Sequence, residues 1–246
     1  MTHFYSDAQC GMKILRKFIA LSSAAIFIPI LAFGAGDMGK TLYDQGDQGA
    51  IIACSSCHGA QGQGEASTGM PALGDLQPAY TIKALQAFKS KERKNDIMNN
   101  IAAGLSEQQM QAVANYISTL PQPKPAAIKS KTLVEKGRIL FEYGKKISAT
   151  DWVPSCYLCH GQNAQGAGDL FPPLINQNAA YLKTQLLDFK SGKRVDQTDG
   201  LMKSIAEKLS KEDIDAISAY LASKSIVRGY EWPYKMRSQA EKKDKR

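Results

Sequence analysis

The chain has 246 residues, a net charge of +8 and 43% hydrophobic residues, a composition typical of a soluble globular protein. This length allows one large domain or two small ones. Positive charges are scattered, apart from a C-terminal run at Lys242, Lys243, Lys245 and Arg246 that we interpret as a solvated tail. Because basic residues do not alternate with aromatic ones, we expect no nucleic-acid partner.

The first 36 residues have the pattern of a signal peptide. Three basic residues precede an apolar run over 18–33, and small residues follow it. An uncleaved membrane anchor is the alternative, but Pro29 and the small-residue end favour cleavage and a periplasmic location. Removal of residues 1–35 leaves 28 basic and 22 acidic residues, a net charge of +6. That charge favours an acidic partner or peripheral association with a membrane surface.

Four cysteines lie beyond the leader, which itself contains Cys10, and they form two C-x-x-C pairs that are each followed by histidine. Both pairs belong to an internal repeat, because CSSCHG over 54–59 recurs as CYLCHG over 156–161. The flanking segments recur as well: GKTLYDQG matches GRILFEYG, and MNNIAAGLSEQQMQAVANYI matches MKSIAEKLSKEDIDAISAYL. The chain therefore contains two copies of one unit.

Each copy is predicted to consist of helices joined by loops, with no convincing strands. Apolar residues recur at helical spacing over 81–91 in the first copy and over 181–190 in the second. The closing helix of each copy begins at a capping box, and the second is the weaker match because aspartate replaces glutamate or glutamine. The boxes are Ser106–Gln109 and Ser210–Asp213.

An earlier helix is expected at the start of each copy. It carries an aromatic residue, Tyr43 in the first and Phe141 in the second, four positions after a glycine. A small residue lets a neighbouring helix approach closely, so we expect both aromatic side chains to pack in the core.

A proline-rich segment, LPQPKPAAIKSK over 120–131, separates the copies. Three prolines in five positions oppose a helix and favour a stiff, extended linker. We place the domain boundary near Ile128, so that residues 37–127 form the first domain and residues 128–246 form the second domain with a C-terminal tail.

The pattern C-x-x-C-H is the attachment signature of c-type haem. Two thiols three positions apart can reach the two vinyl groups on one porphyrin edge, and the next imidazole can then coordinate iron. Two disulfides or one four-thiolate zinc site are the alternatives, but neither explains the histidine and the glycine-rich stretch after each pair. We therefore predict two covalently bound haem c groups. The thioether residues are Cys54, Cys57, Cys156 and Cys159, and the proximal iron ligands are His58 and His160.

The sixth iron ligand is predicted to be methionine. The one remaining histidine, His3, lies in the leader, so a second histidine is not at hand for either iron. Met98 and Met202 each stand seven residues before a leucine in the repeat, whereas Met70 and Met110 align with residues other than methionine. We therefore predict Met98 as the distal ligand of the first iron and Met202 as that of the second.

At these motifs the chain resembles class I cytochromes c, and more closely the dihaem cytochrome c4 family. The resemblance covers nearly all of residues 37–225 and is carried by FPPLINQNAAYLKTQLLDFKSGKR and, more loosely, by MPALGDLQPAYTIKALQAFKSKER. It implies an all-α fold of two tandem class I cytochrome c domains joined by the linker, with the haems facing each other. It also implies that the carbonyl groups of Pro71 and Pro172 accept hydrogen bonds from the proximal imidazoles.

The chain departs from this pattern in the insertion KKISATDWVPS before Cys156 and in the tail after Ser225. The leading hypothesis is single-electron transfer between redox proteins, such as a membrane oxidase, a reductase or a dehydrogenase, because filled axial positions keep substrates from iron. The alternative is the electron-accepting subunit of a larger oxidoreductase, which the tail favours. A dihaem peroxidase or sulfur-compound oxidase would need an open or displaceable ligand at one iron.

Overall fold

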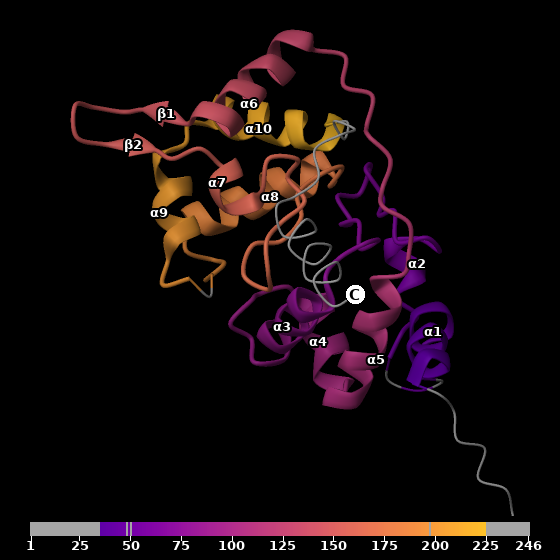
Figure 1. The fold of residues 1–246 in the computed structure, drawn as a ribbon. Coiled ribbons are helices and arrows are strands. Elements are labelled where there is room, and N and C mark those ends of the chain that lie inside the picture. Colours follow the sequence, from indigo (N-terminus) through magenta and orange to yellow (C-terminus); the bar gives the residue numbers. More distant parts are fainter. Residues whose placement is uncertain (1–34, 48, 50, 197, 225–246) are drawn as a thin grey trace, which may run out of the picture. The chain divides into compact units, whose positions relative to one another are not determined.

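The computed structural model describes residues 35–47, 49, 51–196 and 198–224, and most of these residues are helical (Figure 1). The predicted signal peptide and tail lie outside the described residues, except that residues 35 and 36 belong to the first helix. None of the described helices is long and apolar enough to span a membrane.

The helices form two series that follow the repeat. The first half, residues 35–117, contains α1 (Ala35–Gln45), α2 (Ser55–His58), α3 (Pro78–Lys89), α4 (Asp96–Gly104) and α5 (Glu107–Ile117). The second half, residues 131–224, contains α6 (Lys131–Tyr143), α7 (Tyr157–His160), α8 (Ala179–Lys190), α9 (Leu201–Lys208) and α10 (Lys211–Ser223). The predicted helices over 81–91 and 181–190 are confirmed, and each begins two or three residues earlier than expected.

A close helix crossing organises each half, as α1 packs against α5 and α6 packs against α10 (Figure 1). A Cβ atom added at Gly39 would lie 2.2 Å from the carbonyl oxygen of Ala112, and one added at Gly137 would lie 2.0 Å from that of Ala216. Any larger residue would push the helices apart, so the predicted role of these glycines is confirmed.

Each crossing surrounds a small hydrophobic core. Tyr43 and Met110 are fully buried in the first half, as are Phe141 and Ile214 in the second. The closing helices begin as the sequence indicates, because both capping boxes are formed. In the second box the aspartate, although shorter than the residues usual there, accepts a hydrogen bond from the Ser210 backbone at 2.9 Å.

The linker runs from α5 to α6 without a helix or strand assigned between residues 118 and 130, as its prolines predict (Figure 1). The linker forms hydrogen bonds with the second half. The backbone N–H of Ala126 donates to the carbonyl of Ala222 at 2.8 Å, and the side chain of Asn176 donates to the carbonyl of Pro123 at 2.9 Å. These bonds hold the linker against the end of α10 and against the loop that precedes α8.

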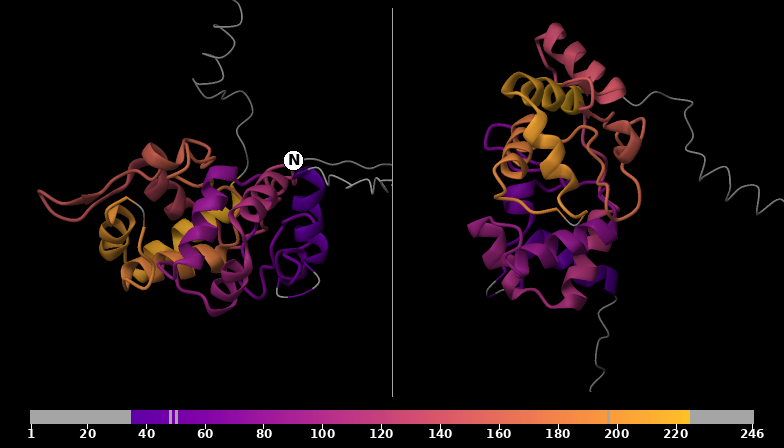
Figure 2. Two further views of the ribbon diagram at one scale, coloured as in Figure 1. Left: turned by 90° about the horizontal axis from the view of Figure 1, so that it is seen from below. Right: turned by 90° about the vertical axis from the view of Figure 1, so that its left-hand side faces the viewer.

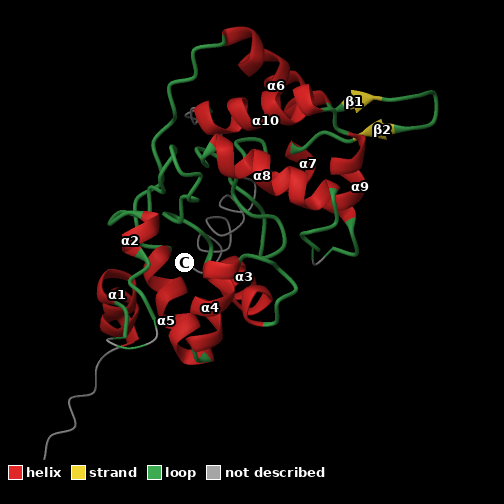
Figure 3. Cartoon of the chain, turned by 180° about the vertical axis from the view of Figure 1, so that it is seen from behind, coloured by secondary structure: helices red, strands yellow, loops and turns green. Residues whose placement is uncertain are grey.

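The expectation of no strands was wrong at one place, the insertion before the second haem motif. There β1 (Lys145–Lys146) pairs antiparallel with β2 (Trp152–Val153) in a hairpin that extends from the helices of the second half (Figures 2 and 3). Strands of two residues are too short to show an alternating pattern in the sequence. The hairpin is held by the burial of Val153 and by a turn in which Ile147 and Ser148 donate to Asp151.

Candidate haem sites

Each C-x-x-C-H motif forms a single helical turn, α2 in the first half and α7 in the second. The first cysteine stands at the beginning of the turn and the histidine at its end. Gly59 and Gly161 follow with φ of 79° and 78°, a left-handed conformation that ends the turn and that side chains rarely adopt. The Tyr43 hydroxyl donates to the Gly59 carbonyl at 2.6 Å, which ties the first motif to α1.

Both motif histidines are buried, with 7% of each side chain exposed. The Nδ1 atom of His58 lies 2.9 Å from the carbonyl oxygen of Pro71, and that of His160 lies 3.0 Å from the oxygen of Pro172. Because a carbonyl can only accept, Nδ1 carries the proton and Nε2 is the nitrogen with a free lone pair. Burial lowers the pKa of both imidazoles, which keeps them neutral and able to coordinate iron.

None of the four motif cysteines is paired in a disulfide. Burial raises the pKa of Cys54 to about 11 and that of Cys156 to about 12, so both are neutral thiols in an apolar environment. Among the described residues, no three His, Cys, Asp or Glu side chains gather as a zinc site would require. Neutral thiols beside a buried imidazole with a free Nε2 fit the edge and the proximal face of a haem.

The predicted distal ligands occupy equivalent helices. Met98 lies in the first turn of α4, which packs on α3, and Met202 lies in the first turn of α9, which packs on α8. Each methionine N–H is held by a side-chain oxygen: Asn95 accepts from Met98 at 2.9 Å, and Asp196 accepts from Met202 at 3.0 Å.

Both methionine side chains are partly exposed, whereas Met110 is fully buried in the core and has a packing role. This difference agrees with the choice that the repeat alignment makes. The assignment of Met98 and Met202 to iron stays a prediction.

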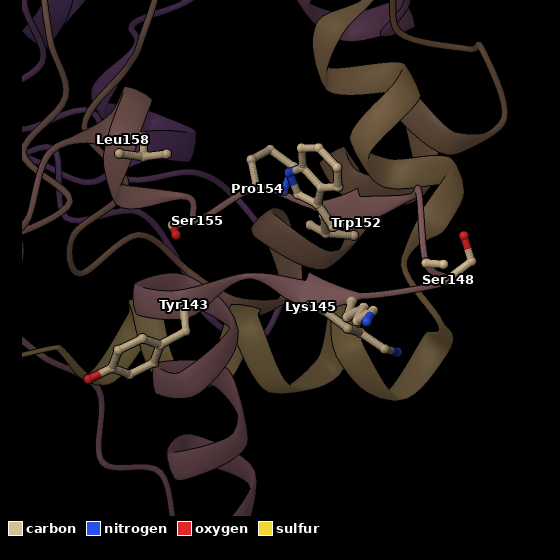
Figure 4. Close-up of a pocket in the computed structure, with 10 residues that line it drawn as sticks. Tyr143, Lys145, Ser148, Trp152, Pro154, Ser155 and Leu158 are labelled. Atoms are coloured by element: carbon tan, nitrogen blue, oxygen red, sulfur yellow. The ribbon is translucent and has the colours of Figure 1, made fainter.

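The two sites differ at the surface next to the motif. A pocket of about 410 Å³ lies between the hairpin and α7, where Tyr143, Trp152, Pro154 and Leu158 contribute to its wall (Figure 4). Trp152 and Leu158 are both more than half exposed. In the first motif, serines occupy the two positions between the cysteines. Trp152 and Leu158 therefore give the second haem motif an apolar surface, beside which the first motif has serines.

Sequence reasoning missed one group of polar residues between the halves. Arg93 and Arg194, with Tyr80 and Tyr181, form a cluster joined by hydrogen bonds. The repeat alignment carries the signal, because both pairs match at an offset of 101. A sequence alone cannot show that equivalent residues of two copies meet.

Each of the two mainly helical halves brings together a buried imidazole with a free Nε2, a pair of cysteines and a partly exposed methionine, and this repeated arrangement defines a c-type cytochrome. The cytochrome c family model matches residues 37–121 and again residues 141–225, and the chain therefore belongs to the cytochrome c family.

The relatives that are similar to the chain include thiosulfate dehydrogenase electron acceptors and cytochromes c4. The thiosulfate dehydrogenase electron acceptor of Stutzerimonas stutzeri (strain A1501) is 37% identical over 81% of this chain and 91% of its own length. The cytochrome c4 of Pseudomonas aeruginosa is 33% identical over 78% of this chain and 90% of its own length.

The solved structures that are similar to the chain include a cytochrome c4 and a thiosulfate dehydrogenase. Reduced recombinant cytochrome c4 from Pseudomonas stutzeri aligns with a TM-score of 0.66 and 31% identity, over 78% of this chain and 100% of that chain. The thiosulfate dehydrogenase TsdBA from Marichromatium purpuratum aligns with a TM-score of 0.72 and 32% identity, over 80% of this chain. The match spans 42% of the TsdBA chain, so this chain corresponds to less than half of that protein.

These findings confirm the resemblance to cytochrome c4, the fold of two tandem cytochrome c domains and the two covalently bound haem c groups. The chain is an electron carrier rather than an enzyme, and it exchanges electrons with redox proteins. The peroxidase or oxidase alternative is therefore wrong. Cytochromes c4 are periplasmic c-type cytochromes.

Proposed function

We propose that this dihaem cytochrome is the electron acceptor of a thiosulfate-oxidising dehydrogenase. The observation that carries the proposal is the pair of relatives named thiosulfate dehydrogenase electron acceptor, at 37% and 34% identity. The TsdBA structure supports it, because there the matching portion belongs to a chain more than twice as long as that portion. The specific partner is thus a dehydrogenase, among the oxidase, reductase and dehydrogenase partners that the sequence allows.

Some residues of the proposed sites hold the haems, and others set the electronic state of the iron. Each haem supplies the redox-active iron. In the first half, Cys54 and Cys57 would hold the haem through thioether bonds, and His58 and Met98 would hold its iron. The imidazole–proline hydrogen bond fixes the histidine ring and makes Nε2 a better donor, while the thioether sulfur of methionine favours a higher potential. With His58 and Met98 both holding the iron, no position would stay open to a substrate, so the group would supply electron exchange and not ligand exchange.

In the second half the same roles fall to Cys156, Cys159, His160 and Met202, with Pro172 as the carbonyl partner. The domains extend over residues 37–127 and 128–246, and residues 1–36 act as a signal peptide that directs the chain to the periplasm. The net charge of +6 after removal of residues 1–35 also supports peripheral association with an anionic membrane.

The test mixes the purified, oxidised holoprotein with a thiosulfate dehydrogenase and thiosulfate, and follows haem reduction by absorbance. Cytochrome c4 of Pseudomonas aeruginosa is the matched control. We expect reduction of both haems, faster than that of the control at equal concentration. Reduction no faster than that of the control would reject the dehydrogenase as the specific partner and leave a general carrier of electrons.

The shuttle and the subunit differ in how long the contact with the dehydrogenase lasts. A stable complex in size-exclusion chromatography at physiological ionic strength identifies a subunit. Fast reduction without a stable complex identifies a shuttle that forms a small, transient interface. N-terminal sequencing of the exported protein tests the leader, and sedimentation with anionic vesicles tests membrane association.

A further inference from the structure

The hairpin of β1 and β2 comes from an insertion in the second copy of the repeat. The offset between the copies is 98 at the pair Gly39 and Gly137, and it is 102 at the pair Cys54 and Cys156. Four additional residues therefore lie between α6 and the second haem motif. The insertion makes the surroundings of the second motif different from those of the first.

Contacts on both strands hold the hairpin against the helices of the second half. Lys145 donates to Asp213 of α10 at 2.6 Å, and Lys208 at the end of α9 donates to Asp151 at 2.5 Å. The side chain of Val153 is buried in the core of this half. Because both strands are fixed, the exposed side chains of the hairpin would lose little conformational entropy when a partner binds them.

Three exposed apolar side chains from separate segments meet at the pocket beside the hairpin (Figure 4). Tyr143 at the end of α6 is 73% exposed, Trp152 in β2 is 59% exposed, and Leu158 in α7 is 64% exposed. Single exposed apolar residues are common, but a group that lines one pocket marks an interaction site. Tryptophan and tyrosine are also among the residues that contribute most to binding at protein interfaces.

The pocket lies outside the set of side chains that would hold the second haem, because Cys156, Cys159, His160 and Met202 are absent from its wall. Leu158, which stands between the two cysteines, does belong to that wall. A protein seated in the pocket would therefore contact the haem motif itself without reaching the iron.

The rim of the pocket is positively charged. The two nearest hairpin and helix carboxylates, Asp151 and Asp213, already form ion pairs with lysines. Lys146 also lines the pocket, is exposed, and forms no ion pair among the described residues. It is the β1 residue paired with Trp152 in the hairpin. The charge beside the apolar surface is thus complementary to a carboxylate.

We propose that the hairpin and α7 form the docking surface for the dehydrogenase, which places an apolar side chain in the pocket and carboxylates around it. The inference rests on the proposed function and adds the place where the dehydrogenase binds. An aromatic centre with a charged rim is typical of a specific protein interface. Each transfer takes one electron from the reduced dehydrogenase and leaves one ferric iron ferrous, and docking here makes the second half the first to be reduced.

The test measures the affinity of the oxidised, full-length holoprotein for a thiosulfate dehydrogenase by isothermal titration calorimetry, after intact-mass measurement has confirmed two haems in each variant. Trp152→Ala should weaken binding about 10- to 30-fold, as expected for an aromatic residue at the centre of an interface. Leu158→Ser should also weaken it, and serine occupies the equivalent position of the first motif. Ile52→Ser is the matched control, because Ile52 is 63% exposed, lies two residues before Cys54, and should leave the affinity unchanged.

Two further measurements separate docking from other effects. Lys146→Gln should weaken binding about two- to fivefold at low ionic strength, and this difference should fade as salt is added. With thiosulfate present, haem reduction in Trp152→Ala should be slow at low dehydrogenase concentration and should approach the wild-type rate at saturation. Reduction of the same variant by dithionite should match that of the wild type.

Wild-type affinity in haem-loaded Trp152→Ala and Leu158→Ser would overturn the proposal, as would an equal loss in Ile52→Ser. A wild-type dimer in sedimentation that Trp152→Ala dissociates would assign the surface to a second copy of the chain and overturn it too. If Trp152→Ala does not fold, Leu158→Ser and Lys146→Gln decide the matter. A wild type that neither binds the dehydrogenase nor is reduced by it would instead reject the proposed function, so the two failures are distinguishable.

Discussion

Replacing Asp196 should weaken the binding of Met202 to the second iron. The effect should be larger than that of replacing Asn95, the equivalent residue, on the binding of Met98 to the first iron. Asp196 lies before α9 and accepts hydrogen bonds from the backbone N–H groups of Met202 and Lys203, at 3.0 and 3.3 Å. The helix has no other side-chain cap, because Gly200 stands at its N-cap position. The start of α9, and with it the methionine, is therefore held by one carboxylate.

The size of the effect follows from these bonds. Loss of a helix cap costs about 0.5–2 kcal/mol, and an ionised acceptor belongs in the upper part of that range. A cost of about 1–2 kcal/mol raises the population with a detached methionine roughly 5- to 30-fold, since 1.4 kcal/mol is tenfold. The equivalent change Asn95→Ala removes one bond to a neutral amide, at 2.9 Å, and should cost about 1 kcal/mol or less at the first iron.

Proton NMR of the reduced protein resolves the methyl group of each iron-bound methionine, and its loss is followed as temperature rises. In Asp196→Ala the signal of Met202 should disappear first and at a lower temperature than in the wild type, with that of Met98 unchanged. The reasoning would be refuted if the signals of Met98 and Met202 disappeared at the same temperature as each other in Asp196→Ala and also in Asn95→Ala.

The pKa of Asp196 determines how the binding of Met202 to the second iron changes with pH. Partial burial works to raise the pKa of Asp196, but hydrogen bonds from Thr198 and the α9 backbone outweigh it and hold the pKa below its usual value. A lowered folded-state pKa gives stabilisation that is complete above the unfolded value of about 3.9 and is lost as pH falls through the folded value. The wild type should therefore lose the Met202 signal in acid, and Asp196→Ala should lose this dependence.

Three further changes test the packing. Gly137→Ala forces α6 away from α10 and should lower the free energy of unfolding by about 1–3 kcal/mol in chemical denaturation, whereas the exposed Thr132→Ala on the same helix should not. Tyr43→Phe leaves a carbonyl without its donor and should cost about 1 kcal/mol in the same assay; an unchanged midpoint would contradict this. Gln177→Ala removes two 2.8 Å bonds to the Ala72 backbone of the opposite half and should separate the calorimetric transitions of the two halves, which a single unchanged peak would disprove.

The sequence predicted those parts of the molecule that depend on local pattern. Helical spacing and capping boxes are patterns of residues that lie close together in the sequence. These patterns, and the glycines opposite Ala112 and Ala216, occur in both copies of the repeat, which strengthened each prediction. The motif residues of each haem site are also local, because C-x-x-C-H places two thiols and an imidazole within one helical turn.

Contacts between segments far apart in the sequence could not be predicted in this way. The hairpin over 145–153 depends on the burial of Val153 and not on a periodic pattern. The cap of α9 comes from Asp196, six positions before Met202. The meeting of Arg93 with Gln185 depends on how two copies pack, which a repeat alignment does not contain.

The central claim is that both motifs bind haem through thioether bonds, and intact-mass measurement tests it most directly. The mature protein, produced in a host that attaches haem c, should exceed its polypeptide mass by two haem groups, and Cys156→Ser combined with Cys159→Ser should exceed it by one. A mass equal to that of the bare polypeptide, or a variant that keeps both haems, would contradict the account.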